Sequence, residues 1–163
     1  MTNIKIIGVG NSFGGDDAVG NMVARQLLPY QSSSVSIVEG CCTGLNLLYE
    51  MPETESLIII DAIHSQLQAG TIVRFTVPQD LDEIEKLTWN SSTPSTHAFG
   101  LGEALILAQT LDLLPQHVTL FGIELGHIQP GKSLSPQVSR SIQSVVLRIV
   151  TEELGQPTCT NSN

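Results

Sequence analysis

Basic residues are scarce in this chain of 163 residues, which has 7 lysines and arginines against 16 aspartates and glutamates. The formal net charge is −9 at pH 7, so the chain lacks the positive surface by which proteins bind nucleic acids or anionic membranes. Long hydrophobic runs are also missing, because stretches such as 57–60 are far shorter than the roughly 20 apolar residues of a membrane helix. We therefore expect neither a nucleic acid partner nor a membrane; an acidic chain favours a basic partner or a bound cation.

Cysteines are few and odd in number, namely Cys41, Cys42 and Cys159, which does not suit a disulfide framework. The first residues lead into an apolar stretch without the pattern of a signal peptide. We expect a cytoplasmic protein with reduced thiols. The length fits one domain, expected over residues 1–155 and followed by a flexible tail at 156–163.

Short apolar segments alternate with helical patterns along the chain. Strands are expected at 4–9, 35–38, 57–60, 71–77 and 118–122. The third of these is the most apolar and is expected at the centre of the sheet, and the fourth alternates as an edge strand does. Helical patterns cover 16–28, 45–49, 99–111 and 135–154, with a further helical turn within 80–87. This order predicts an α/β fold, a three-layer sandwich whose mostly parallel five-stranded twisted sheet carries helices on both faces.

Ligands of such folds bind at the carboxyl ends of the strands, and a glycine-rich segment with Asp16 and Asp17 follows the first strand. The spacing of its glycines does not match the dinucleotide pattern G-x-G-x-x-G. Two aspartates at a helix start would also repel a pyrophosphate. One of them is expected to cap the helix, which leaves the other free to face the crevice.

Two further side chains are expected at the same edge of the sheet. Asp61 directly follows the third strand, where a carboxylate must either accept hydrogen bonds from nearby amides or point into a site. His97 lies between an irregular stretch and a helix, and taken alone it suits a structural hydrogen bond. Together with Asp17, these residues form a set of two carboxylates and one imidazole that suits nickel or zinc.

Other side chains offer weaker alternatives. The pair of Cys41 and Cys42 could bind a soft metal, but the chain lacks the second cysteine pair of a structural zinc site. Cys42 could also act as a nucleophile beside His97. Ser12 lacks the G-x-S-x-G elbow of a serine nucleophile. These alternatives are His64 as a ligand, His117 as a structural or surface residue, His127 in a loop that could contact a partner, Cys41 with Cys42, and Ser12.

Four segments of the chain match a known family in the same order, across about residues 4–150. They are residues 8–20, residues 57–62, Thr96-His97-Ala98-Phe99-Gly100-Leu101 and Leu134-Ser135-Pro136. On these segments the chain resembles the hydrogenase maturation endopeptidases, which remove a C-terminal extension from the large subunit of nickel–iron hydrogenases. No H-E-x-x-H zinc-protease motif is present.

The resemblance implies that Asp17, Asp61 and His97 are the metal-binding and catalytic residues. It also implies that the nickel is supplied by the precursor rather than held permanently, and that the partner is the large-subunit precursor; we expect the enzyme to be a monomer. Where family members often read D-G-G-T, this chain reads Glu39-Gly40-Cys41-Cys42-Thr43, a segment that the resemblance assigns to substrate recognition.

Two mechanisms and two other function classes stay open at this point. Water bound to the metal could attack the scissile carbonyl, or an aspartate could act as general base while the metal only positions the peptide. A nickel-checkpoint chaperone that holds the precursor without cutting it would use the same three residues. A nucleotide-binding module is disfavoured by the glycine spacing and the two aspartates.

Overall fold

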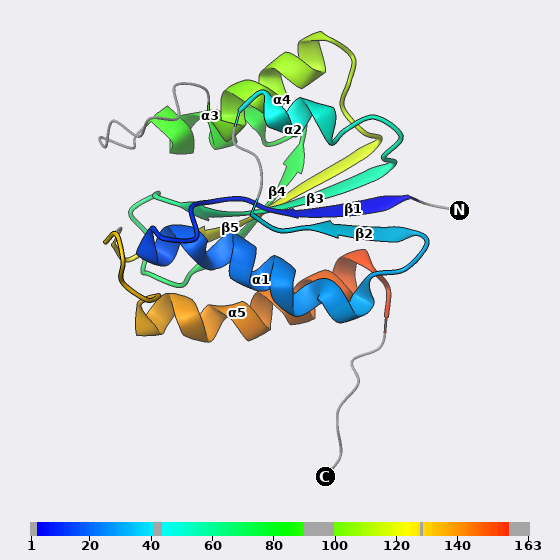
Figure 1. Cartoon of the computed structure of the whole chain (residues 1–163). Coiled ribbons are helices and arrows are strands. Elements are labelled where there is room, and N and C mark those ends of the chain that lie inside the picture. The colour runs from blue at the N-terminus through cyan, green and yellow to red at the C-terminus, as the bar shows by residue number, and fades with distance from the viewer. Residues whose placement is uncertain (1–2, 41–43, 90–99, 128, 157–163) are drawn as a thin grey trace.

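The computed structural model describes residues 3–40, 44–89, 100–127 and 129–156 (Figure 1). Within them, five strands form one sheet in the order β2-β1-β3-β5-β4. Neighbouring strands are parallel except for β4, which pairs antiparallel with β5 at the edge. The central position of β3 and the edge position of β4 are as predicted. The strands are β1 (Ile4–Gly8), β2 (Val35–Val38), β3 (Ser56–Ile63), β4 (Ile72–Val77) and β5 (His117–Glu124).

Helices cover both faces of the sheet, so the predicted three-layer α/β sandwich is confirmed. Figure 1 shows α1 and α5 on one face and α2, α3 and α4 on the other. The helices are α1 (Val19–Leu27), α2 (Asn46–Tyr49), α3 (Leu81–Trp89), α4 (Leu101–Thr110) and α5 (Pro136–Arg148). Short 3-10 turns, Gly15–Ala18 and Leu28–Tyr30, flank α1, and a π-helical turn, Ile149–Glu153, continues α5.

Alternation along the strands builds two hydrophobic cores. In β3, Ile58 and Ile60 pack beneath α1 and α5, whereas Leu57 and Ile59 pack beneath the layer of α2, α3 and α4. Both faces of the parallel strands are therefore buried, which is why they appear in the sequence as continuous apolar runs.

Two glycines let α1 lie directly on the sheet. A Cβ atom at Gly20 would overlap the carbonyl oxygens of Ile60 and Val9, and one at Gly8 would overlap the carbonyl oxygen of Gly20. The backbone of the helix thus packs against the backbone of β1 and β3 without a side chain between them. This close approach holds the start of α1, and the turn before it, against the carboxyl ends of the two strands.

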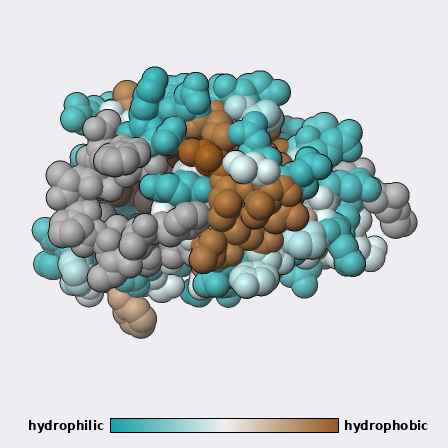
Figure 2. Space-filling view, turned by 90° about the horizontal axis from the view of Figure 1, so that it is seen from above, coloured by the Kyte–Doolittle hydropathy of each residue, from teal (hydrophilic) through white to brown (hydrophobic). Residues whose placement is uncertain are grey.

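The layer of α2, α3 and α4 carries apolar surface on its outer side. Figure 2 shows hydrophobic side chains gathered over α2 and α4. Leu45, which precedes α2, and Leu111 and Leu113, which follow α4, are exposed. In the part of the chain that the structure describes, no helix combines the length and apolar character needed to cross a membrane.

Candidate functional site

Asp61 lies where β3 extends beyond β1. The pairing of the two strands ends with Gly8 opposite Ile60, and the backbone N–H of Val9 donates to the carbonyl oxygen of Ile60 at 2.8 Å. Asp61 is the next residue of β3, and strand alternation directs it to the same face as Ile59, toward the layer that contains α4. Its side chain is half-buried.

Asp17 reaches the same edge of the sheet from the 3-10 turn before α1. Its Oδ2 atom accepts a hydrogen bond from the backbone N–H of Asn11 at 3.0 Å. A Cβ atom at Gly14 would lie 3.4 Å from that oxygen, so the loop after β1 wraps closely around the carboxylate. Asp17 is also half-buried.

The two carboxylates are close enough to influence each other. Burial raises the pKa of Asp61 to about 8, and the negative charge of Asp17 adds to this rise, although a hydrogen bond from the backbone of Ala62 opposes it. Among the described residues, no lysine or arginine forms an ion pair with either side chain. The two carboxylates therefore suit a bound cation, which would offset the repulsion between their negative charges.

The third expected ligand, His97, lies outside the described residues. Helix α4, which begins at Leu101, packs on the face of the sheet toward which Asp61 is directed. Over residues 3–40, 44–89, 100–127 and 129–156, no group of three or more His, Cys, Asp or Glu side chains could hold a metal ion. The described part of the candidate site thus supplies two carboxylates.

Asp16 has a different role from its neighbour. Its side chain is 1% exposed and accepts hydrogen bonds from the backbone N–H groups of Gly126, His127 and Ser135 and from the Ser135 hydroxyl. Burial alone would raise the pKa of Asp16, but these hydrogen bonds outweigh burial and hold the pKa below its ordinary value. The carboxylate thus fastens the loop before α5 to the turn that carries Asp17.

The expectation that one of the two aspartates caps the helix is wrong. Residue Ala18 occupies the N-cap of α1, and no side chain caps either the helix or the preceding 3-10 turn. The physical reason is that both aspartates lie within the 3-10 turn that precedes α1, from which Asp16 binds the loop before α5 and Asp17 binds the loop after β1.

Asn21 joins two loops of the site, and sequence reasoning missed it. From the buried face of α1, its amide group donates to the carbonyl oxygen of Gly10 at 3.0 Å and to the Ser12 hydroxyl at 3.3 Å. Its Oδ1 atom accepts a hydrogen bond from the N–H of Gly40 at 2.9 Å. The signal in the sequence was an asparagine on the apolar side of a helix, where a polar side chain needs partners.

Replacing Asn21 with alanine is expected to destabilise the protein by about 1–3 kcal/mol, because the backbone groups of Gly10 and Gly40 lose their hydrogen bonds to this buried side chain. Thermal unfolding should show a lower Tm, and substrate recognition should weaken because the loops after β1 and β2 lose their link. The exposed Asn46→Ala variant is the control. Equal Tm values for the two variants would contradict this role.

Glu124 was also missed, because β5 was expected to end at Gly122 and instead continues to Glu124. This buried carboxylate accepts hydrogen bonds from the backbone N–H groups of Ser65 and Gln66 and from the Ser65 hydroxyl. It therefore orders the loop after β3, the strand that carries Asp61. An acidic residue at the end of an apolar strand was the same signal that pointed to Asp61.

The remaining candidates from the sequence form no hydrogen bond or ion pair with Asp17 or Asp61 among the described residues. Glu39 pairs with Arg25 at 2.9 Å. Residues 41–43, with Cys41, Cys42 and Thr43, lie outside the described residues. The side chains of His64, His117, His127 and Ser12 are all exposed.

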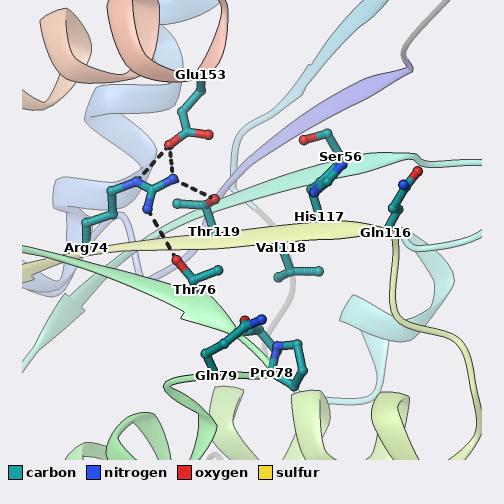
Figure 3. A pocket seen from close by; sticks show the side chains of 11 residues that line it. Ser56, Arg74, Thr76, Pro78, Gln79, Gln116, His117, Val118, Thr119 and Glu153 are labelled. Atoms are coloured by element: carbon teal, nitrogen blue, oxygen red, sulfur yellow. Dashed lines mark hydrogen bonds and ion pairs between the residues drawn. The ribbon is translucent and has the colours of Figure 1, made fainter.

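A cavity of about 250 Å³ lies at the opposite edge of the sheet, near the first residues of β3 and β5, Ser56 and His117. Figure 3 shows the guanidinium of Arg74 directed toward Glu153, with which it forms an ion pair at 2.8 Å. Because this cation is already paired and the cavity lies at the amino ends of the strands, it is not part of the candidate site.

Comparison with known proteins gives one consistent result. A family model described as "Hydrogenase maturation protease" matches residues 19–152. The Hydrogenase 2 maturation protease of Escherichia coli K12 is 30% identical over 153 residues, which cover 90% of this chain and 88% of that protein. The hydrogenase expression/formation protein HupD of Thiocapsa roseopersicina is 27% identical, and the match covers 88% of this chain but 64% of HupD.

Solved structures of hydrogenase maturation proteases share the fold of this chain. The hydrogenase maturating endopeptidase HybD from E. coli has a TM-score of 0.76 at 26% identity, over 94% of each chain. HybD from Thermococcus kodakarensis, a nickel–iron hydrogenase maturation protease, has a TM-score of 0.69 at 27% identity, over 95% of this chain and 100% of that one.

Proposed function

Because this chain belongs to the hydrogenase maturation protease family, we propose that it is an endopeptidase that removes the C-terminal extension of a nickel–iron hydrogenase large-subunit precursor after nickel insertion. The observation that carries the proposal is the pair of Asp17 and Asp61. These two carboxylates lie at the carboxyl edge of the sheet, where ligands of such folds bind, close enough for the charge of Asp17 to raise the pKa of Asp61, and no described cation neutralises them.

The nickel is proposed to arrive with the precursor, as part of the substrate. The described donor set fits this idea, because two carboxylate oxygens form an open site that suits a cation already held by other ligands. His97 is proposed as the third ligand. In this scheme the enzyme recognises a precursor by its nickel, and the metal brings the scissile segment against the two aspartates. We propose that it acts as a cytoplasmic monomer.

Hydrolysis requires a water molecule whose oxygen bonds to the scissile carbonyl carbon. In one route an aspartate, in its ionised form, takes the proton from that water and passes it to the amide nitrogen as the C–N bond breaks. Alternatively, the nickel itself lowers the pKa of the attacking water, and the aspartates only hold the metal. Both routes use the same residues and give the same products.

The proposal is tested by the intact mass of a large-subunit precursor from the same organism before and after incubation with this protein. We expect the nickel-loaded precursor to lose its C-terminal extension and the nickel-free precursor to keep its mass. The His97→Ala variant should leave both forms uncut. A nickel-loaded precursor that binds stably but keeps its mass would indicate the checkpoint chaperone instead, and cleavage of both forms alike would contradict the role of nickel.

A further inference from the structure

Phe13 is an aromatic side chain that the fold leaves in solvent. It is 80% exposed, whereas Phe75 and Phe121 are 3% and 0% exposed. A single exposed apolar residue is common in proteins and by itself indicates no function. Phe13 differs from such a residue in the hydrogen bonds of its backbone and in the place of its loop beside Asp17.

Hydrogen bonds fix the backbone on both sides of this residue. The N–H of Phe13 donates to Oδ1 of Asn11 at 3.0 Å, and the carbonyl oxygen of Phe13 accepts from the N–H of Gly131 at 2.9 Å. The N–H of Gly14 donates to the carbonyl oxygen of Asn11, also at 2.9 Å. The loop after β1 is thus bonded to itself and to the loop before α5, in a conformation that leaves the ring exposed.

The same turn holds a carboxylate of the candidate site. The N–H of Asn11 donates to Asp17, and the side chain of Asn11 in turn accepts from Phe13. Gly14, the next residue after Phe13, approaches the Asp17 carboxylate so closely that a Cβ atom there would lie within 3.4 Å of it. Phe13 therefore belongs to the loop that surrounds the Asp17 carboxylate.

We propose that Phe13 is a docking contact for an apolar side chain of the precursor beside the scissile peptide. This inference rests on the proposed function and adds to it a residue that determines substrate binding. An aromatic side chain on a hydrogen-bonded backbone offers a large apolar surface and has only two side-chain torsions to lose when a partner covers it. Its place in the loop that surrounds Asp17 puts the covered segment of the precursor near that carboxylate.

The test measures kcat and KM for cleavage of nickel-loaded precursor by the wild type and three variants. Phe13→Ala removes the ring, Phe13→Leu keeps an apolar side chain, and Leu147→Ala removes an exposed apolar side chain on α5. We expect Phe13→Ala to raise KM by about 10- to 30-fold with kcat within about threefold of the wild type, because a fully covered aromatic contact contributes binding of that size. Phe13→Leu should restore most of the loss, and Leu147→Ala should behave as the wild type.

Binding is measured in parallel, with the same precursor and with variants that also carry Asp61→Asn. A change in KM below twofold for Phe13→Ala, or a fall in kcat at unchanged KM, would overturn the docking role while cleavage by the wild type upholds the proposed function. If the wild type binds the precursor without cutting it and Phe13→Ala weakens that binding, the docking contact stands and the protease proposal fails. A wild type that neither binds nor cuts overturns both.

Discussion

Asp61→Asn is expected to abolish cleavage of the precursor and, at the same time, to stabilise the protein at neutral and alkaline pH. The loss of cleavage should be about 10³-fold, because the variant removes a carboxylate that serves as general base or as metal ligand. The gain in stability follows from the environment of Asp61, in which burial and the charge of Asp17 raise its pKa to about 8. Asparagine has a similar shape and carries no charge.

The pH dependence of this effect has a defined sign. The unfolded chain releases the proton of Asp61 near the ordinary pKa of 3.8, whereas the folded protein keeps it until about pH 8. Between these values the folded state binds more protons, so the free energy of unfolding of the wild type falls as the pH rises. The Asp61→Asn variant lacks this decrease and should be more stable by on the order of 2 kcal/mol at pH 8.

Thermal unfolding between pH 5 and pH 9 checks this prediction. The variant should unfold about 4–8 °C higher than the wild type at pH 8, with a smaller difference at pH 5. The exposed Asp112→Asn variant is the control and should follow the wild type in both stability and cleavage. Parallel pH profiles of Tm for the wild type and Asp61→Asn would contradict the inferred environment of Asp61.

Asp16→Asn, one residue before the proposed ligand Asp17, is expected to destabilise the protein by about 3 kcal/mol or more, since four hydrogen bonds to this buried carboxylate lose their charged acceptor. An asparagine side chain cannot replace the carboxylate, because both Asp16 oxygens accept hydrogen bonds and the NH₂ group of asparagine would face one set of these donors. Urea unfolding at pH 7 should show the loss as a lower midpoint with an unchanged slope. Cleavage should weaken as well, because the turn that carries Asp17 is no longer fastened to the loop before α5.

The stabilisation by Asp16 should disappear in acid. Its hydrogen bonds hold the folded pKa below the ordinary 3.8, so the contribution is complete above pH 3.8 and is lost as the pH falls through the folded value. The difference in free energy of unfolding between the wild type and Asp16→Asn should therefore be large at pH 7 and should decrease below pH 3.8. A difference that stays constant down to pH 2.5 would show that packing, rather than the ionised carboxylate, stabilises the protein at this position.

The order of strands and helices could be predicted from two signals. Continuous apolar runs indicate strands that are buried on both faces of a sheet, and apolar residues at helical spacing indicate the helices that cover it. The position of Asp61 could be predicted for a related reason: it directly follows the most apolar run, and strand ends of this fold meet at one edge. Glu124 offered the same signal but was missed, because the last strand runs two residues further than its apolar pattern suggested.

Other parts of the site depend on geometry that a sequence does not display. Asp16 and Asp17 are adjacent and chemically identical, and only the direction of the 3-10 turn decides which of them binds the distant loop. The partners of Asn21 lie in two different loops, at Gly10 and Gly40, and become neighbours only when β1 and β2 pair side by side. The backbone of Phe13 likewise bonds to Gly131, more than a hundred residues later in the chain.

The hydrogen bonds of Asp16 also determine when during synthesis the site can form. Their donors, Gly126, His127 and Ser135, follow Asp16 by 110 to 119 residues, so this contact closes a very long loop of chain. A nascent chain that has emerged only as far as α4 contains Asp17 and Asp61 but lacks these donors, so the turn that carries Asp17 is not yet bonded to the loop before α5. This part of the site is therefore completed late, once β5 and the start of α5 have left the ribosome.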